Sequence, residues 1–401
     1  MTQRICMTTL EFPPDVGGVG ESVQRIARML QELGYEVHVV VFRAVFRTEK
    51  EKASAGEYRR SSCQTSQQDG ITVHRLQPAV RSALAKEQDY LCDLYSQLKE
   101  LHHHYCFDAF HAFFINETGF LSTLIAQESG IPAISSVRGA DLHKHLFSPS
   151  QHAQIAWTLA NSAWSTFVSA DLMKRARTLV PEIREKSTAF WNSITPIDFE
   201  ALSTPALAER LQGTVIGSVG SFRDKKGLEY LFDACRTLQA DYTLLLVGDF
   251  VEKEHGYWEQ ELANSGIADR VVITGKISRQ EALAYLPLID IFAIPSINDG
   301  CPNALLEAML AARAIIGTNV DAIGEILDDG TDALLVNPCS SEELAVALKR
   351  LIAQPNLRQQ LGLNARNKVL HQLAPAVEKK HWEQVYQQAL GTTKAIEANV
   401  A

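Results

Sequence analysis

Several features that would place a chain in a special class are missing from these 401 residues. No uninterrupted apolar run reaches roughly 18 residues, so the sequence offers no membrane-spanning helix. The N-terminal residues show neither the charged nor the apolar region of a signal peptide. We therefore expect a cytoplasmic protein, with peripheral contact at the inner face of the membrane as an alternative.

Cysteines are few, and basic residues are outnumbered by acidic ones, 38 to 47. The seven cysteines are scattered, and none of their spacings is that of a metal or redox site, so we expect free thiols and no bound metal. The net charge of −9 argues against a nucleic-acid partner. We find no internal repeat and no low-complexity tract.

What is present is the composition of a globular protein, with 46% hydrophobic and 21% charged residues. The length suits two α/β domains of about 200 residues each. Two series of alternating strands and helices are predicted, the first from residues 5–7 and the second from residues 215–219. Such alternation is typical of doubly wound parallel sheets covered by helices on both faces.

The expected elements follow from apolar runs and helical periodicity. A helix near 21–33 precedes a strand at 37–41, and residues 48–70 are expected to form a long polar loop. Further strands are expected at 71–76, 109–112, 133–136, 166–169, 243–247, 271–274, 291–294, 314–317 and 334–336.

The strongest local pattern is Ala-Ile-Pro-Ser-Ile-Asn-Asp-Gly-Cys-Pro-Asn-Ala-Leu-Leu-Glu-Ala-Met at 293–309. An apolar strand stops at a proline, a turn with Asp299 and Gly300 follows, and Pro302 suits the first position of a helix. The pattern therefore predicts a strand, a loop and a helix whose first amides are open to a ligand.

The start of that helix has the chemistry to bind a nucleotide. The amides of Asn303 and Ala304 are suited to phosphate oxygens. Glu307 lies about one turn further on, where its carboxylate can accept hydrogen bonds from ribose hydroxyls. The alternative is an ordinary strand, loop and helix with a surface glutamate.

The spacing within 293–309 resembles the acidic motif of the retaining GT-B glycosyltransferases of family 4. In that family a Pro-Ser pair precedes a carboxylate, a Gly-x-Pro and a glutamate eight residues after the first carboxylate. The resemblance implies that Glu307 holds the donor ribose and that Asp299 approaches the donor sugar. Asp299 stands where the family has Glu, one methylene longer.

The resemblance extends over nearly the whole chain and implies the domain arrangement. It predicts two Rossmann-like domains facing a central cleft, with a C-terminal helix that returns to the first domain. The N-terminal domain would comprise residues 1–205, completed by the helix 373–401. The donor-binding domain would comprise residues 206–372.

Residues 219–227 resemble the family's diphosphate loop. Lys226 matches the family's lysine, which neutralises phosphate charge. Ser221 stands where the family usually has Arg, and Arg223 is the candidate to replace it. The alternative is a solvated helix start, although basic side chains there oppose the helix dipole when no anion is bound.

Three further segments of the second half resemble family motifs. The resemblance implies that the strand end at Gly248 contacts the donor and that the backbone of Lys276 and Ile277 reads the base. Glu325 keeps the position of the glutamate in Gly-Gly-x-x-Glu, whereas both glycines are replaced, by Asp321 and Ala322.

The N-terminal half contributes weaker candidates. Gly17 and Gly18 follow the first strand and resemble the pair whose amides approach the distal phosphate. A dinucleotide loop would instead require an acidic residue at the end of the second strand, where this sequence has Arg43.

Three more residues of this half match family positions after strands. Arg138 replaces the histidine of the family's His-Gly-x-Asp, and because arginine stays charged it cannot act as a base. Asp141 is the aspartate of that motif, and His111 matches the family's histidine at the edge of the cleft.

The sequence thus predicts a retaining glycosyltransferase that uses a nucleotide-sugar donor, with no cofactor and no bound metal. Lys226, Arg223, Asp299 and Arg138 are the candidate catalytic residues. The acceptor would be a saccharide, a lipid-linked saccharide or a small molecule. Two alternatives stay open: a nucleotide-sugar epimerase of the same fold, and a catalytically silent binding subunit.

Overall fold

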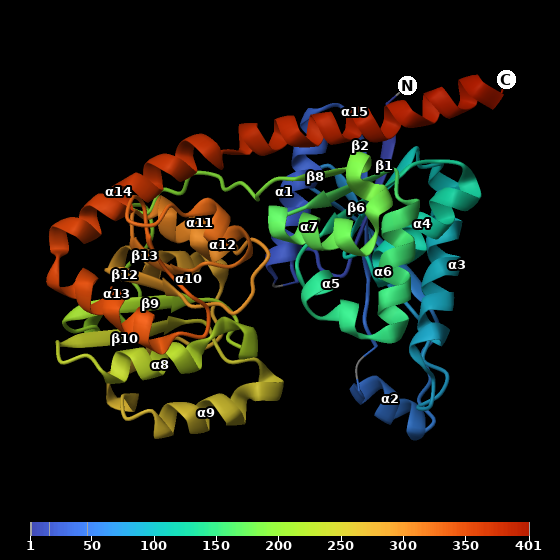
Figure 1. Ribbon diagram of the computed structural model, residues 1–401. Helices are drawn as coiled ribbons and strands as arrows, with labels where there is room; N and C mark the ends of the chain where they lie inside the picture. Colours follow the sequence, from blue (N-terminus) through green and yellow to red (C-terminus); the bar gives the residue numbers. More distant parts are fainter. Residues whose placement is uncertain (1, 16, 46, 401) are drawn as a thin grey trace. The chain divides into compact units, whose positions relative to one another are not determined.

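The computed structural model describes residues 2–15, 17–45 and 47–400, and the chain forms two compact units (Figure 1). Unit 1 runs to Phe190 and resumes at Glu378, and unit 2 is Trp191–Val377. The division falls earlier than the expected boundary at residue 205. Residues 191–205 belong to unit 2 because Ile194, Phe199 and Leu202 pack on its core.

Unit 1 is built on an eight-stranded sheet of order β3-β4-β2-β1-β5-β6-β7-β8. The strands β1, β2, β4, β5, β6, β7 and β8 pair in parallel. The bounds are β1 Arg4–Thr9, β2 Glu36–Phe42, β3 Ser62–Gln68, β4 Ile71–Gln77, β5 Ala109–Phe113, β6 Ala133–Val137, β7 Trp164–Phe167 and β8 Ser187–Ala189.

Helices cover both faces of this sheet. Helices α1 (Gly18–Glu32) and α15 (Pro375–Val400) share one core with β1 and β2, where α15 contributes Trp382, Val385, Tyr386 and Ala389. Helices α3 (Glu87–Tyr105) and α4 (Glu117–Ser129) share a second core with Cys6, Val40 and Phe110. The other α-helices among the described residues of unit 1 are α2 Arg47–Ser54, α5 Ala140–His143, α6 Pro149–Asn161 and α7 Ala170–Leu179.

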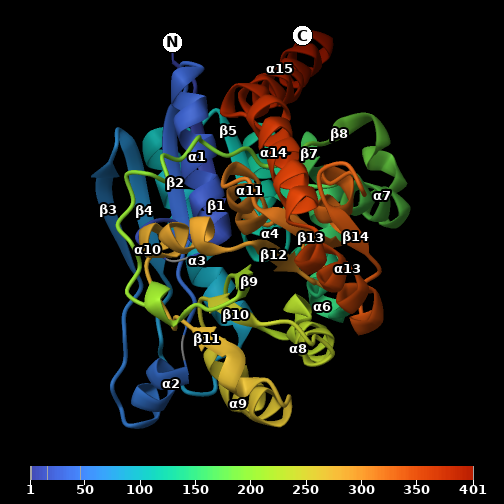
Figure 2. The same ribbon diagram turned by 90° about the vertical axis from the view of Figure 1, so that its left-hand side faces the viewer.

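The expected polar loop at 48–70 is wrong, because this segment contains α2 and β3. Strand β3 is polar throughout and lies at the edge of the sheet, antiparallel to β4 (Figure 2). Its side chains are almost all exposed, so no apolar alternation announces it. The positive φ angles of Asp69 and Gly70 match the Asp-Gly turn of a two-residue hairpin, which sets the register Gln68↔Ile71.

Unit 2 is a six-stranded parallel sheet of order β11-β10-β9-β12-β13-β14. Its strands are β9 Thr214–Val219, β10 Tyr242–Val247, β11 Val271–Ile273, β12 Ile291–Ile294, β13 Ala314–Thr318 and β14 Leu334–Val336. The strand order reverses between β9 and β12. In open α/β sheets the carboxyl ends of strands at such a switch point are where ligands bind.

Unit 2 buries apolar side chains on both faces of its sheet. One core joins the sheet to α10 (Arg279–Tyr285), α11 (Asn303–Leu310), α12 (Asp321–Ile326) and α14 (Pro355–Gln372). The other joins it to α8 (Leu228–Arg236), α9 (His255–Asn264) and α13 (Ser341–Ala353). Each unit thus has the predicted doubly wound α/β architecture.

Candidate functional site

The loops after β9 and β12 are held together at the switch point of unit 2. Gly227 has a φ of 63°, and a Cβ atom at this position would overlap the main-chain oxygen of Pro295. The amide of Ile297 donates to the main-chain oxygen of Lys225 at 2.9 Å. The loop after β9 (residues 220–227, the lysine loop) and the loop after β12 (residues 295–302, the acidic loop) are therefore fixed against each other at one corner of the unit.

Lys225, Lys226 and Asp299 meet at this corner. Lys226 Nζ lies 2.5 Å from Asp299 Oδ2, and Lys225 Nζ lies 3.4 Å from Asp299 Oδ1. The Asp299 side chain is buried and both lysines are largely covered, so these basic groups are not a solvated helix start. Sequence reasoning selected Lys226 and Asp299 for the site and gave Lys225 no role in it.

Burial and charge act against each other on these groups. Burial would raise the pKa of Asp299, but the charges and hydrogen bonds of Lys226 and Lys225 outweigh it and hold the pKa far below its usual value. Burial lowers the pKa of Lys225, and the charge of Asp299 opposes that effect. The carboxylate is therefore ionised at neutral pH.

Asp321 explains one departure from the family pattern. Oδ2 of Asp321 accepts a hydrogen bond from the amide of Asp299 at 3.0 Å, and the backbone φ of Asp321 is 42°. Aspartate is one of the few residues other than glycine that adopt left-handed backbone. This side chain therefore replaces the family's glycine and also anchors Asp299, a role that sequence reasoning missed.

The start of α11 differs from the expectation by one residue. Pro302 is the N-cap, with extended backbone, and the helix begins at Asn303. Asn303 and Ala304 are only partly buried. Asn192 Nδ2 donates to the main-chain oxygen of Cys301 at 3.1 Å and holds the loop before the helix.

Glu307 has a partner that sequence reasoning also missed. Arg279, at the start of α10, donates from Nε at 3.0 Å and from Nη2 at 2.8 Å, both to Glu307 Oε1. The Glu307 side chain is 8% exposed, whereas Arg279 is half exposed. The Ser278-x-x-Glu281 capping box marks the start of α10 in the sequence, but no local pattern identifies Glu307 as the partner of Arg279.

The remaining candidates of unit 2 make other contacts or are exposed. Gly248 is needed for packing, because a Cβ atom at this position would overlap the main-chain oxygen of Gly220. The Gly248 amide donates to Thr274 Oγ1 at 2.8 Å. Glu325 accepts the indole N–H of Trp191 at 3.0 Å. Gly300 is buried beside Asp299, Ile277 packs on the core, and Ser221, Arg223 and Lys276 are exposed.

In unit 1, Gly17 is the N-cap of α1, and the helix begins at Gly18 rather than at residue 21. The Glu11 carboxylate occupies the space in which a Cβ of Gly17 would stand. An anion that approached the amides of Gly17 and Gly18 would therefore meet a negative charge.

Asp141 connects the loops after β5 and β6. It is fully buried and accepts the amides of Ile115 at 2.7 Å and Arg138 at 2.9 Å. Burial raises the pKa of Asp141, and these backbone hydrogen bonds oppose the rise. The aspartate thus positions the backbone of Arg138, whose guanidinium lies 5.9 Å from the centre of the Phe113 ring.

His111 was expected at the edge of a cleft, and the structure corrects this. It lies within β5, fully buried, with Nδ1 2.9 Å from Tyr386 Oη and Nε2 2.8 Å from Ser136 Oγ. Burial, assisted by the charge of Arg138, lowers its pKa to about 3. His111 is therefore a neutral core residue that joins α15 to the sheet.

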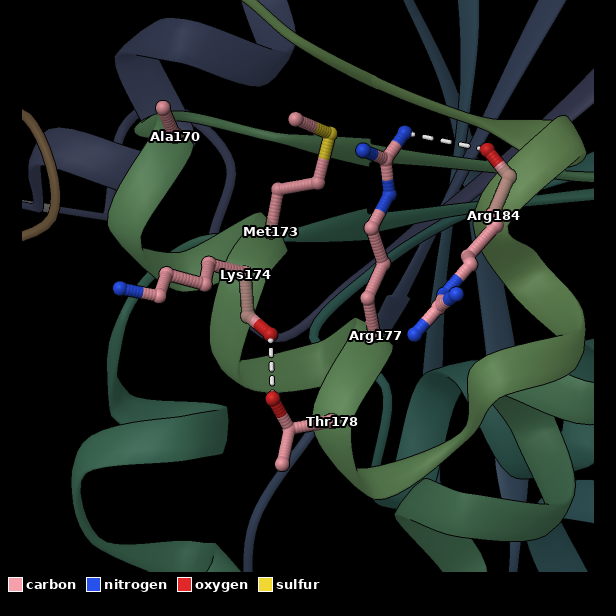
Figure 3. A pocket seen from close by; sticks show the side chains of 6 residues that line it. All are labelled: Ala170, Met173, Lys174, Arg177, Thr178 and Arg184. Atoms are coloured by element: carbon pink, nitrogen blue, oxygen red, sulfur yellow. Dashed lines mark hydrogen bonds between the residues drawn. The ribbon is translucent and has the colours of Figure 1, made fainter.

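A cavity of about 250 Å³ lies elsewhere in unit 1, against α7 (Figure 3). Its lining includes Lys174, Arg177 and Arg184. Arg177 bonds the main-chain oxygens of Arg184 and Ser187, both at 3.1 Å, so this guanidinium has a structural task. None of the residues predicted for the site lines this cavity.

Comparison with known proteins follows the division into two units. Residues 17–185 match the family described as Glycosyl transferase 4-like domain, and residues 213–354 match Glycosyl transferases group 1. The N-acetyl-alpha-D-glucosaminyl L-malate synthase of Bacillus anthracis is 23% identical over 388 residues, covering 95% of this chain and 96% of that protein. Three other relatives are matched over 43%, 38% and 59% of their own length.

Solved structures of similar fold cover nearly the whole chain. Sucrose-phosphate synthase from Thermosynechococcus elongatus has a TM-score of 0.78 at 19% identity, covering 97% of this chain and all of that one. The Anabaena protein HepE, in complex with UDP, has a TM-score of 0.71 at 16% identity, covering 96% of this chain and all of that one. Among the described residues, no helix has the length and apolar character needed to cross a membrane.

Proposed function

We propose that this chain, which belongs to the GT-B glycosyltransferases of group 1 (family 4), transfers a sugar from a nucleotide-diphosphate donor to an acceptor hydroxyl. The observation that carries the proposal is the corner of unit 2 at its switch point. Two ammonium groups meet one buried carboxylate there, on the loops after β9 and β12, and the buried Glu307 lies in the helix that follows the second loop.

The parts of the donor are assigned by charge and hydrogen bonding. Lys226, with Lys225 beside it, would stabilise the negative charge that develops on the leaving diphosphate. The first amides of α11, at Asn303 and Ala304, would bind phosphate oxygens. Arg279 binds Oε1 of Glu307, so the other carboxylate oxygen, Oε2, would accept hydrogen bonds from the ribose hydroxyls. Lys276 and Ile277 stay the candidates for reading the base.

The proposed transfer retains the anomeric configuration. The bond between the anomeric carbon and the diphosphate oxygen breaks, and the acceptor oxygen forms its bond on the same face. The acceptor proton passes to the departing phosphate, so no base is required from the enzyme. Arg138 stays protonated and can only bind a sugar hydroxyl or an anion. The Lys226 ammonium group would neutralise charge on the diphosphate without a metal.

The test is a screen of UDP-, ADP- and GDP-sugars for binding by calorimetry and for donor hydrolysis, with and without EDTA. UDP comes first because the Anabaena relative of the same fold is described in complex with UDP. We expect one donor to bind and to release its nucleoside diphosphate in EDTA. A purified, folded protein that binds none of these donors would instead be a silent subunit.

The screen with the preferred donor then continues to acceptors and to stereochemistry. Saccharides, lipid-linked saccharides and small hydroxylated molecules are the three classes to compare. The anomeric proton of the product, followed by NMR, reports retention or inversion directly. Formation of a free sugar isomer at the rate of nucleotide release, with no acceptor dependence, would support the epimerase alternative.

A further inference from the structure

The Asp299 carboxylate lies between two ammonium groups, where the proposed function needs a diphosphate. It is 8% exposed as a residue, and each of its oxygens faces a different lysine. The contact with Lys226 is short, at 2.5 Å, and that with Lys225 is looser, at 3.4 Å. A carboxylate directed at the donor sugar would not have both oxygens turned to the lysines.

We propose that Asp299 is an internal counter-ion, which holds the two ammonium groups in place while the site is empty and gives up Lys226 to the diphosphate when the donor binds. This inference rests on the proposed function, because it assigns the ligand of Lys226 to a nucleoside diphosphate. It gives Asp299 a positioning role and withdraws the expected contact with the donor sugar.

The surrounding contacts show why the carboxylate stays in place during this exchange. The Asp299 amide is anchored by Asp321, and the lysine loop is fixed to the acidic loop by the bond between Ile297 and Lys225. With both loops fixed, Lys226 can turn to a phosphate while Lys225 continues to neutralise the carboxylate. The second lysine is thus explained as the partner that stays with Asp299.

Like charges make the exchange measurable. A phosphate bound at Lys226 would lie within a few ångströms of the Asp299 carboxylate, and the two negative charges repel each other in a poorly solvated corner. Asp299 therefore weakens diphosphate binding, although it keeps the lysines in position. A neutral amide of the same shape removes the repulsion and also removes the counter-ion of the empty site.

The experiment compares UDP, ADP and GDP, each as diphosphate and as nucleotide-sugar, on the wild type and on Asp299→Asn by calorimetry. We expect Asp299→Asn to bind the preferred nucleoside diphosphate about tenfold more tightly. The unliganded variant should melt at a lower temperature, because two ammonium groups lose their counter-ion, and the diphosphate should raise its melting temperature more than that of the wild type.

Two controls separate this effect from other causes. Asp233→Asn removes an exposed carboxylate that pairs with Arg236 on α8, and it changes the net charge equally. We expect it to leave affinity unchanged. In a Lys226→Met background, the gain from Asp299→Asn should disappear, because the ligand and the carboxylate no longer compete for that ammonium group.

Distinct results would overturn the inference. If Asp299→Asn binds the diphosphate equally or more weakly, the carboxylate is not a counter-ion that the ligand displaces. If the variant loses affinity for the nucleotide-sugar alone, Asp299 contacts the sugar. Either result leaves the proposed function intact. If no nucleoside diphosphate binds to the wild type or to Asp299→Asn, the inference and the proposed function both fail.

Discussion

The two units of this chain differ in the polar groups that they bury in and beside their sheets. Within its sheet, unit 1 joins neutral groups: His111 bonds Tyr386 and Ser136, and His38 Nδ1 lies 3.0 Å from His74 Nε2. Its buried ion pair, Arg25 with Glu378 at 2.9 Å, joins helices α1 and α15 instead. Unit 2 uses charge pairs. Besides the pairs at the switch point, Lys368 Nζ bonds the carboxylates of Asp332 at 2.6 Å and Asp328 at 2.7 Å.

The difference separates groups that fix the fold from groups that can exchange partners. A neutral hydrogen-bonded histidine in a core gains nothing from a charged ligand, and its loss leaves unpaired polar atoms. In a buried ion pair, by contrast, a ligand ion with the same sign of charge as one partner can replace that partner. The charge pairs at the switch point of unit 2 are therefore where we propose that an anion binds, and the neutral networks in the sheet of unit 1 belong to the scaffold.

The largest expected effect follows from removing the central cation. Lys226→Ala should lower turnover by about a hundredfold or more, because one fixed donor to the leaving group contributes about 3 kcal/mol. Lys253→Ala is the matched control, since that lysine is 69% exposed and pairs with its neighbour Glu254. Steady-state rates on the preferred donor give the comparison, and wild-type turnover of Lys226→Ala would remove this lysine from the site.

The second effect concerns Glu307, the proposed partner of the donor ribose. Glu307→Gln should weaken nucleotide binding by about 1.5–3 kcal/mol, because hydrogen bonds to a charged acceptor are lost. Arg279→Met should weaken binding less, since it only releases the carboxylate from its position. Calorimetry with the nucleotide and with its 2′,3′-dideoxy analogue provides the measurement.

The analogue also supplies the control for Glu307. Without ribose hydroxyls, the wild type, Glu307→Gln and Arg279→Met should bind almost alike. Equal losses for both ligands would mean that Glu307 and Arg279 only hold α10 against α11.

The third effect is specific to unit 1 and concerns pH. Burial lowers the pKa of His111 from 6.5 to about 3, so the folded unit keeps it neutral while the unfolded chain binds a proton below pH 6.5. Stability is therefore lost as the pH falls from 6.5 toward 3, by about 2 kcal/mol from this residue at pH 5. Burial of His74, whose pKa is lowered to about 4, acts in the same direction.

Hydrogen exchange at pH 7.5 and pH 5 follows the two units separately. We expect protection in β1 and β5 to fall on acidification more than protection in β9 and β12. In His111→Gln, which does not titrate, unit 1 should be less stable at pH 7.5 but should lose less on acidification. The same acid loss in this variant and in the wild type would assign the effect to other groups.

Much of the fold was predictable because apolar runs and helical periodicity are properties of short segments of the sequence. Apolar runs predicted the parallel strands other than β8 to within a few residues, and α1 followed from the spacing of Val23, Ile26 and Leu30. Strand β8, with the sequence Ser-Thr-Ala, has no apolar run and was missed. The edge strand β3 was missed because exposed polar side chains carry no such pattern. Its antiparallel pairing depends on the Asp69-Gly70 turn, which is a signal that the sequence does contain.

The site was predictable as a set of motifs and not as a set of contacts. Lys226, Asp299 and Glu307 lie on segments whose spacing is local. Their partners Lys225, Arg279 and Asp321 are set by which loops meet at the sheet's switch point, and that is a tertiary property. His111 shows the reverse error, because a histidine next to a motif looks functional until Tyr386, 275 residues later, occupies its ring nitrogen.

The smallest expected effect tests why an aspartate stands where the family has glycine. Asp321 has a φ of 42°, a conformation that costs most L-residues about 1–2 kcal/mol and costs glycine nothing. Its carboxylate offsets part of this by accepting the Asp299 amide at 3.0 Å. Asp321→Gly loses that hydrogen bond, worth about 1 kcal/mol, and gains backbone freedom, so unit 2 should change by less than about 1 kcal/mol.

Asp321→Ala loses the same hydrogen bond and keeps the unfavourable φ, so it should be less stable than Asp321→Gly by about 1 kcal/mol. This reverses the usual order, in which alanine stabilises a helix relative to glycine. Hydrogen exchange in β9 and β12 of unit 2, followed as urea is raised, measures both variants. If Asp321→Ala proves more stable than Asp321→Gly, the backbone of residue 321 is not left-handed in solution. The only role left for Asp321 would then be the hydrogen bond from its carboxylate to the Asp299 amide.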